Sequence, residues 1–118
     1  QDHFRRHVLG LFAEYGVDVL VYPTVQVPPP TFVNLADGVY TALTFPTNTV
    51  IASQAGLPAL TVPVGFTADG LPVGLEVVAR PFAETTLLRV AAGLEGLLGA
   101  RRSPSVPATV GAGAIDAR

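Results

Sequence analysis

The sequence has 118 residues, of which 49% are hydrophobic and 14% are charged, with a formal net charge of −2 at pH 7. Because seven basic residues face nine acidic ones, no basic surface is available for nucleic acid or anionic lipid, and we expect neither partner. The absence of cysteine excludes disulfides, thiolate catalysis and cysteine-bound metals. No apolar run approaches the roughly 20 residues that span a bilayer and no signal peptide is visible, so we expect a cytoplasmic protein without a membrane partner.

Residues 2–15 carry apolar side chains at helical spacing, and Gly16 follows where a left-handed helix terminator is expected. We predict an amphipathic helix whose solvent side carries the charged residues. The apolar stripe consists of Phe4, Val8, Leu11, Phe12 and Tyr15, and the charged residues are Arg5, Arg6 and Glu14.

Residues 17–22 form a short, nearly all-apolar run that Pro23 closes. This pattern is typical of a strand in a parallel sheet that is buried on both faces. A helix followed directly by such a strand predicts an α/β unit.

Between residues 23 and 47 the hydrophobic periodicity is lost, and three consecutive prolines, residues 28–30, make the chain stiff and extended. A connection of this length without obvious elements is uncommon in a compact domain unless it shapes a site. The next segment, up to Gly56, predicts one or two helical turns with Thr47 or Asn48 as the N-cap.

Two apolar runs, residues 59–66 and 72–79, flank an Asp69-Gly70 pair, which predicts a β-hairpin over residues 59–79. Neither arm alternates cleanly between apolar and polar residues, so we expect the hairpin to be covered on both faces inside a layered α/β body. Pro63 donates no ladder hydrogen bond, which places it at an edge, a bulge or a strand end.

A second helical stripe begins at Glu84 and ends at Gly99. It consists of Leu87, Leu88, Ala91, Leu94, Leu97 and Leu98. The following residues, 103–118, are mostly Pro, Ala, Gly and Ser, and we expect a flexible tail after a folded segment of residues 1–102.

Two further groups of titratable residues could have a functional role, but we predict a structural or solvent-exposed role for each. His3 and His7 would share a helix face and could bind a metal, but no third ligand lies near them in the sequence, so we expect a solvated face and no metal site. Glu76 lies in an apolar strand, where a carboxylate needs a partner. We predict a structural ion pair with Arg80 or Arg89 rather than a general base.

Taken in order, several motifs resemble the C-terminal part of amidase signature enzymes, over nearly all of residues 2–99. They are DVLVYPT at 18–24, AGLPALTVPVGFTADGLPVGLEVVARPF at 55–82 and ETTLLRVAAGLE at 84–95. The resemblance implies an α/β fold with a mixed central sheet between helical layers. It also implies cleavage of an amide by a Ser nucleophile, a second Ser in a cis peptide and a Lys, without a cofactor. The hairpin sequence is more similar to members that act on simple, aryl or peptide amides than to tRNA-dependent amidotransferase subunits.

The chain departs from the family in the groups that react. It has no Lys, because all seven basic residues are Arg. Its serines, Ser53, Ser103 and Ser105, do not lie in the Gly-Ser-rich setting of the family nucleophile. Acyl transfer needs an activated nucleophile, a base and oxyanion donors. We therefore assign no catalytic residue and expect the chain alone to be inert.

The resemblance implies instead that residues 40–54 form part of the wall of the substrate pocket. The side chains that suit an apolar pocket with a few polar groups are Tyr40, Thr44, Phe45, Asn48 and Ser53. The alternative is that Asn48 caps a helix and Phe45 belongs to the core.

Three functional hypotheses follow. The favoured one is a non-catalytic C-terminal segment of an amidase whose substrate is a small-molecule amide. The second is a stand-alone scaffold or binding module, a pseudoenzyme remnant without hydrolase activity. The third is a split enzyme whose triad lies on another chain. The sequence is unusually hydrophobic for its length and contains no methionine. We therefore expect a fragment, a processed chain or one segment of a larger protein. Its apolar faces would pack on the rest of the amidase domain or self-associate.

Overall fold

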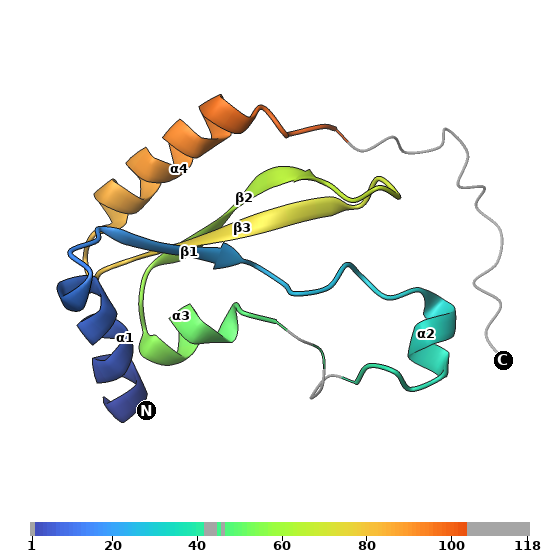
Figure 1. Cartoon of the computed structure of the whole chain (residues 1–118), viewed down its shortest axis with the longest axis horizontal. Coiled ribbons are helices and arrows are strands. Elements are labelled where there is room, and N and C mark those ends of the chain that lie inside the picture. The colour runs from blue at the N-terminus through green and yellow to red at the C-terminus, as the bar shows by residue number, and fades with distance from the viewer. Residues whose placement is uncertain (1, 42–44, 46, 104–118) are drawn as a thin grey trace, which may run out of the picture.

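A computed structural model describes residues 2–41, 45 and 47–103 of the chain. Figure 1 shows a small sheet with helices on both sides. In chain order the elements are α1 (Asp2–Glu14), β1 (Val19–Pro23), α2 (Phe32–Ala36), α3 (Val50–Ala55), β2 (Ala59–Phe66), β3 (Pro72–Ala79) and α4 (Glu84–Leu98). This confirms an α/β architecture. The expected tail lies outside the described residues from 104 onward, and its first residue, Ser103, is exposed.

The three strands have the order β1-β3-β2, and both pairings are antiparallel. Val19 of β1 lies opposite Ala79, and Ala59 of β2 lies opposite Val78. The prediction of a doubly buried parallel strand at residues 17–22 is therefore wrong for the pairing that the structure describes. An all-apolar run does not report the direction of its neighbour. Moreover, β1 is an edge strand here, with Val21 52% exposed.

The C-terminal half of β3 forms the centre of the fold, because helices cover it on both faces. Figure 1 shows α4 on one side of the sheet and α1 with α3 on the other. Successive β3 side chains point to opposite faces, so Val78 joins one buried cluster while Val77 and Ala79 join the other. The first cluster also contains Val8, Phe12, Ala52, Ala55 and Leu57, and the second also contains Val62 and Leu87.

The hairpin is confirmed, together with the role of its turn residues. Gly70 has a φ of 81°, a left-handed conformation that glycine adopts without steric cost. Its N–H donates to the Thr67 carbonyl at 2.9 Å, and the Thr67 N–H donates to the Leu71 carbonyl at 2.8 Å. In β2 the pairing register shifts between Pro63 and Gly65, so this proline lies at a bulge on an edge strand, as expected.

The helix predicted at residues 2–15 is confirmed, and Gly16 ends it with a φ of 61°. Two details of its predicted faces are wrong. Phe4 and Tyr15 are exposed rather than buried. Arg5 does not lie on the solvent side, because its guanidinium donates hydrogen bonds to the Ala55 and Gly56 carbonyls at the end of α3. A helical period predicts which residues share a face and not how much of that face is covered.

A second arginine binds the C-terminal end of α1. The guanidinium of Arg80, just after β3, donates to the Phe12 carbonyl at 3.2 Å and to the Val17 carbonyl at 2.8 Å. The same group lies 5.8 Å from the centre of the Phe12 ring. Because carbonyls at a helix C-terminus lack intrahelical partners and carry negative partial charge, Arg5 and Arg80 each stabilise a helix end.

The connection between β1 and α3 contains a helix that the sequence analysis did not predict. Thr31 caps α2 through its hydroxyl, which accepts from the Asn34 N–H at 3.2 Å. Five residues are too few to show a helical period, so the pattern gives no sign of this helix. No residue of α2 is buried, and Phe32 is 92% exposed.

The second predicted helix is confirmed as α4, which Gly99 ends in a left-handed conformation. Leu87 and Ala91 are buried against the sheet. The other leucines of the predicted stripe are covered less: Leu94 is half-buried, while Leu88, Leu97 and Leu98 are exposed. The apolar face of α4 is therefore wider than the area that the described strands cover. No described helix has the length and apolarity needed to cross a bilayer.

Candidate functional site

The candidate site is the loop that joins β1 to α3, whose last part belongs, with most of α3, to the pocket wall predicted at residues 40–54. The chain leaves β1 at Pro23 and returns to the same place, because Val25 and Thr47 form an antiparallel bridge. The Asn48 N–H donates to the Thr24 carbonyl at 3.1 Å, and the Thr24 N–H donates to the Gly74 carbonyl of β3 at 3.0 Å. The two ends of the loop are thus joined to each other and to the central strand.

The side chain of Asn48 lies at this junction. Its Nδ2 donates to the Pro23 carbonyl at 2.7 Å, and its Oδ1 accepts from Gln26 Nε2 at 3.0 Å. The alternative interpretation of Asn48 as a helix cap is wrong, since α3 has Thr49 at its N-cap position and no side-chain capping bond. Sequence reasoning missed Gln26 altogether, because its partner is 22 residues away and no local pattern marks the pair.

Tyr40 and Phe45 lie together in the loop. Their ring centres are 5.6 Å apart and the ring planes meet at 73°, an edge-to-face arrangement that aromatic pairs favour. Both side chains are half-buried and neither belongs to the buried clusters, so the alternative placing of Phe45 in the core does not hold. Thr44, between them in sequence, lies outside the described residues.

Ser53 lies apart from these residues, exposed on α3. It lines a hollow of about 170 Å³ together with Asp2, Arg5, Gln54, Ala55 and Gly56. No hydrogen bond of the described residues brings a base to its hydroxyl. The structure therefore brings Tyr40 and Phe45 together, places Asn48 at the loop junction, and leaves Ser53 on a separate surface. Whether these residues bind substrate stays a prediction.

The buried carboxylate of Glu76 has a different partner from the one predicted. Glu76 is 4% exposed on the central strand, and its Oε1 accepts a hydrogen bond from the Tyr22 hydroxyl at 3.2 Å. Arg80 binds the carbonyls at the end of α1, and Arg89 is exposed on α4, so the predicted ion pair is wrong. The pairing follows from the register, in which Tyr22 lies directly opposite Glu76. The sequence alone does not reveal that register.

This pair predicts a specific pH dependence. Burial, and then the nearby Glu76 carboxylate, raise the pKa of Tyr22 well above the ordinary tyrosine value of about 10. Above that ordinary value the unfolded chain loses a proton that the folded chain keeps, so this contribution to stability is complete below about pH 10 and is lost as the pH rises. Urea unfolding of Tyr22→Phe between pH 8 and 11 should therefore show a shallower alkaline decline than the wild type.

At neutral pH the same variant should be less stable by about 1–3 kcal/mol, because the Glu76 carboxylate loses its hydroxyl donor. Tyr15→Phe, which removes an exposed hydroxyl, is the matched control. Equal alkaline slopes for Tyr22→Phe and the wild type would contradict the assignment.

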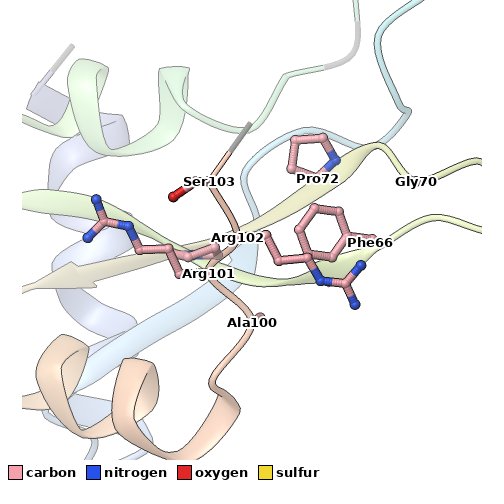
Figure 2. A pocket seen from close by; sticks show the side chains of 8 residues that line it. Phe66, Gly70, Pro72, Ala100, Arg101, Arg102 and Ser103 are labelled. Carbon is pink, nitrogen blue, oxygen red and sulfur yellow. The ribbon is translucent and has the colours of Figure 1, made fainter. Parts of the chain in front are cut away.

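A separate hollow of about 590 Å³ lies between the hairpin and the segment that follows α4. Figure 2 shows Phe66 and Pro72 on one side of it and Ala100–Ser103 on the other. The guanidinium of Arg102 stacks on the Phe66 ring at 4.5 Å, whereas Arg101 extends in the opposite direction. Of the predicted pocket residues that the structure describes, none lines this hollow.

The described residues contain no group of three or more side chains that could hold a metal ion. His3 and His7 are both exposed on α1, as expected for a solvated face. The site therefore consists of an anchored loop with an aromatic pair.

The Amidase family profile matches residues 1–88, and this chain belongs to the amidase family. Its relatives include a fatty acid amide hydrolase of Medicago truncatula, 41% identical over 108 residues, which are 85% of this chain and 18% of that protein. A glutamyl-tRNA(Gln) amidotransferase component of Brevibacillus brevis is 40% identical over 93 residues, which are 76% of this chain and 18% of that protein.

Solved structures agree with this assignment. The peptide amidase of Stenotrophomonas maltophilia matches with a TM-score of 0.68 and 33% identity, covering 88% of this chain and 20% of that chain. A 6-aminohexanoate cyclic dimer hydrolase matches with a TM-score of 0.64 and 32% identity, covering 80% of this chain and 23% of that chain. The chain therefore spans about a fifth of the length of the relatives that it matches.

Proposed function

We propose that this chain is the C-terminal, non-catalytic segment of an amidase-type hydrolase, in which it completes the sheet and lines the pocket for a small-molecule amide. The observation that carries the proposal is the combination of family membership with the absence of reactive groups. The 118 residues contain no Lys, and the family resemblance implies a Lys and two Ser residues in the triad. Amide hydrolysis would then depend on groups that lie outside this sequence.

The exposed apolar side chains are consistent with a segment that packs against other parts of a larger domain. Single exposed apolar residues are ordinary, but here they gather on particular elements. All of α2 is uncovered, and α4 carries three exposed leucines, Leu88, Leu97 and Leu98. The most exposed of these apolar side chains are Phe32 at 92%, Phe82 at 94% and Leu97 at 85%. In the parent enzyme, other helices and strands would cover these surfaces.

The edges of the sheet differ in how well they can accept further strands. In β2, Pro63 lacks a backbone N–H and the pairing with β3 is irregular beside it, so this strand is a poorer partner for a further strand. The outer edge of β1 has no proline before Pro23, where the strand ends. We therefore place the remainder of the proposed mixed sheet beside β1.

Grafting tests the proposal. In the Stenotrophomonas maltophilia peptide amidase, the matching fifth of the chain would be replaced by this sequence, and amide hydrolysis would be compared with that of the isolated chain. We expect turnover by the chimera and none above buffer by the isolated chain, because enzymes with an intact triad accelerate such reactions by about a million-fold or more. Supplying the upstream portion as a separate chain tests the split-enzyme alternative.

Ser53→Ala in the isolated chain is the control for an unforeseen nucleophile. Turnover by the isolated chain that disappears in this variant would contradict the proposal. A chimera that folds but stays inactive would favour the stand-alone scaffold instead.

A further inference from the structure

We propose that Asn48 is a positioning residue that fastens the loop between β1 and α3, and that it sets the placement of Tyr40 and Phe45 rather than contacting the substrate itself. This inference rests on the proposed function, since it assumes that the loop lines a substrate pocket. It departs from the sequence-based assignment of Asn48 as a substrate ligand. Asn48 forms hydrogen bonds with Pro23, Thr24 and Gln26, and these bonds carry the inference.

The amide group of Asn48 is held in one orientation. A backbone carbonyl only accepts hydrogen bonds, so the atom that lies 2.7 Å from the Pro23 oxygen must be the NH₂ nitrogen. The side-chain oxygen then faces Gln26, whose Nε2 donates to it at 3.0 Å. The nitrogen and the oxygen of the side-chain amide are thus both bound to residues at or just after the end of β1. A ligand that bound this amide would have to break one of these hydrogen bonds.

The backbone of the same residue forms the second part of the fastening. Its N–H donates to the Thr24 carbonyl, next to the Val25–Thr47 bridge. The Thr24 N–H in turn donates to Gly74 on the central strand. Thr24 therefore links the end of the loop to β3, and the side chain of Asn48 adds a bond to the carbonyl of Pro23, where β1 ends.

The aromatic pair depends on this arrangement. Phe45 lies three residues before Asn48, and its N–H donates to the Thr41 carbonyl at 3.0 Å. Tyr40 meets it edge to face, so a shift of Phe45 would also change the surroundings of the Tyr40 ring. Loss of the side-chain bonds of Asn48 would leave this end of the loop held only by its backbone bonds, and we expect the weaker fastening to shift the rings.

Hydrogen exchange and kinetics together test the inference. In the isolated chain, Asn48→Ala should accelerate hydrogen exchange of backbone amides about 5- to 20-fold, as expected when one or two hydrogen bonds of ordinary strength are lost. The effect should appear in peptides that contain residues 24–41 and in longer peptides that include residues 47 and 48. Asn48→Asp should behave like Asn48→Ala, because a carboxylate keeps the size but cannot donate to the Pro23 carbonyl. Gln26→Ala should add little to Asn48→Ala, since the two residues share one bond.

Asn34→Ala is the matched control, because this asparagine lies in the same loop, is exposed, and makes no side-chain hydrogen bond with the described residues. In the chimeric amidase, Asn48→Ala should raise KM several-fold with a smaller change in kcat. The control should leave both unchanged.

The outcomes separate the two hypotheses. Unchanged exchange in Asn48→Ala overturns the fastening role whether or not the chimera is active. A raised KM with unchanged exchange identifies Asn48 as a substrate contact and overturns the inference in that way. Accelerated exchange with wild-type KM overturns the positioning role. If the chimera with the wild-type segment is inactive, the proposed function fails, and the exchange result alone decides the fastening role.

Discussion

Phe12→Ala is expected to lower the free energy of unfolding by about 3–5 kcal/mol, the typical cost of removing a fully buried aromatic side chain. Phe12 is 1% exposed and is among the largest fully buried side chains of the described residues. It packs with Val8, Ala55 and Val78, and thereby joins α1 to α3 and to the central strand. Because domains of this size are stable by only about 5–15 kcal/mol, the variant should lose a large fraction of its stability and unfold at a clearly lower urea concentration.

Urea denaturation followed by circular dichroism measures this effect. Phe4→Ala is the matched control, since Phe4 lies on the same helix and is 37% exposed. We expect the control to lose no more than about 1 kcal/mol, as surface substitutions do. Similar losses in the two variants would mean that α1 does not pack through Phe12 in solution.

Gly56→Ala is expected to cost about 2–3 kcal/mol, of which only part comes from the backbone. Gly56 has a φ of 60°, where a side chain is strained by about 1 kcal/mol or more. A Cβ there would also lie 2.8 Å from Nη1 of Arg5, the guanidinium that binds the end of α3. The variant must therefore displace Arg5 from the carbonyls that it caps.

Gly16→Ala isolates the contribution of the arginine. Gly16 has nearly the same φ, 61°, and a Cβ there would meet nothing within 4 Å. The difference between the two melting temperatures measures the contact with Arg5, and it should shrink when Arg5 is replaced by alanine in both backgrounds. An equal loss in Gly56→Ala and Gly16→Ala would show that the guanidinium does not occupy this position.

The features that the sequence predicted well are those that depend on neighbouring residues. The turn at Asp69-Gly70, the helix ends at Gly16 and Gly99, and the special position of Pro63 all follow from local backbone chemistry. The apolar periods of α1 and α4 likewise predicted where these helices lie. Family membership was predicted from the order of several such motifs and was confirmed.

The features that the sequence did not predict depend on residues far apart in the chain. Arg5 and Arg80 bind carbonyls 50 and 68 residues away, so no local pattern distinguishes them from solvent-exposed arginines. A buried carboxylate such as Glu76 predicts a positively charged partner, but the strand register gives it the hydroxyl of Tyr22. The position of Asn48 in the sequence suggests a cap or a ligand, whereas its amide binds Pro23 and Gln26.

The shared anchoring of the two loop ends has a consequence for how such a segment can be altered. Since Val25 and Thr47 already bring the ends together, inserted residues need not change the position of β1 or α3. The entropy of closing a loop grows only slowly with its length, by about 0.6 kcal/mol for each doubling. The stretch between these two residues should therefore tolerate replacement by loops from relatives with other substrate preferences, while the surrounding sheet keeps its shape.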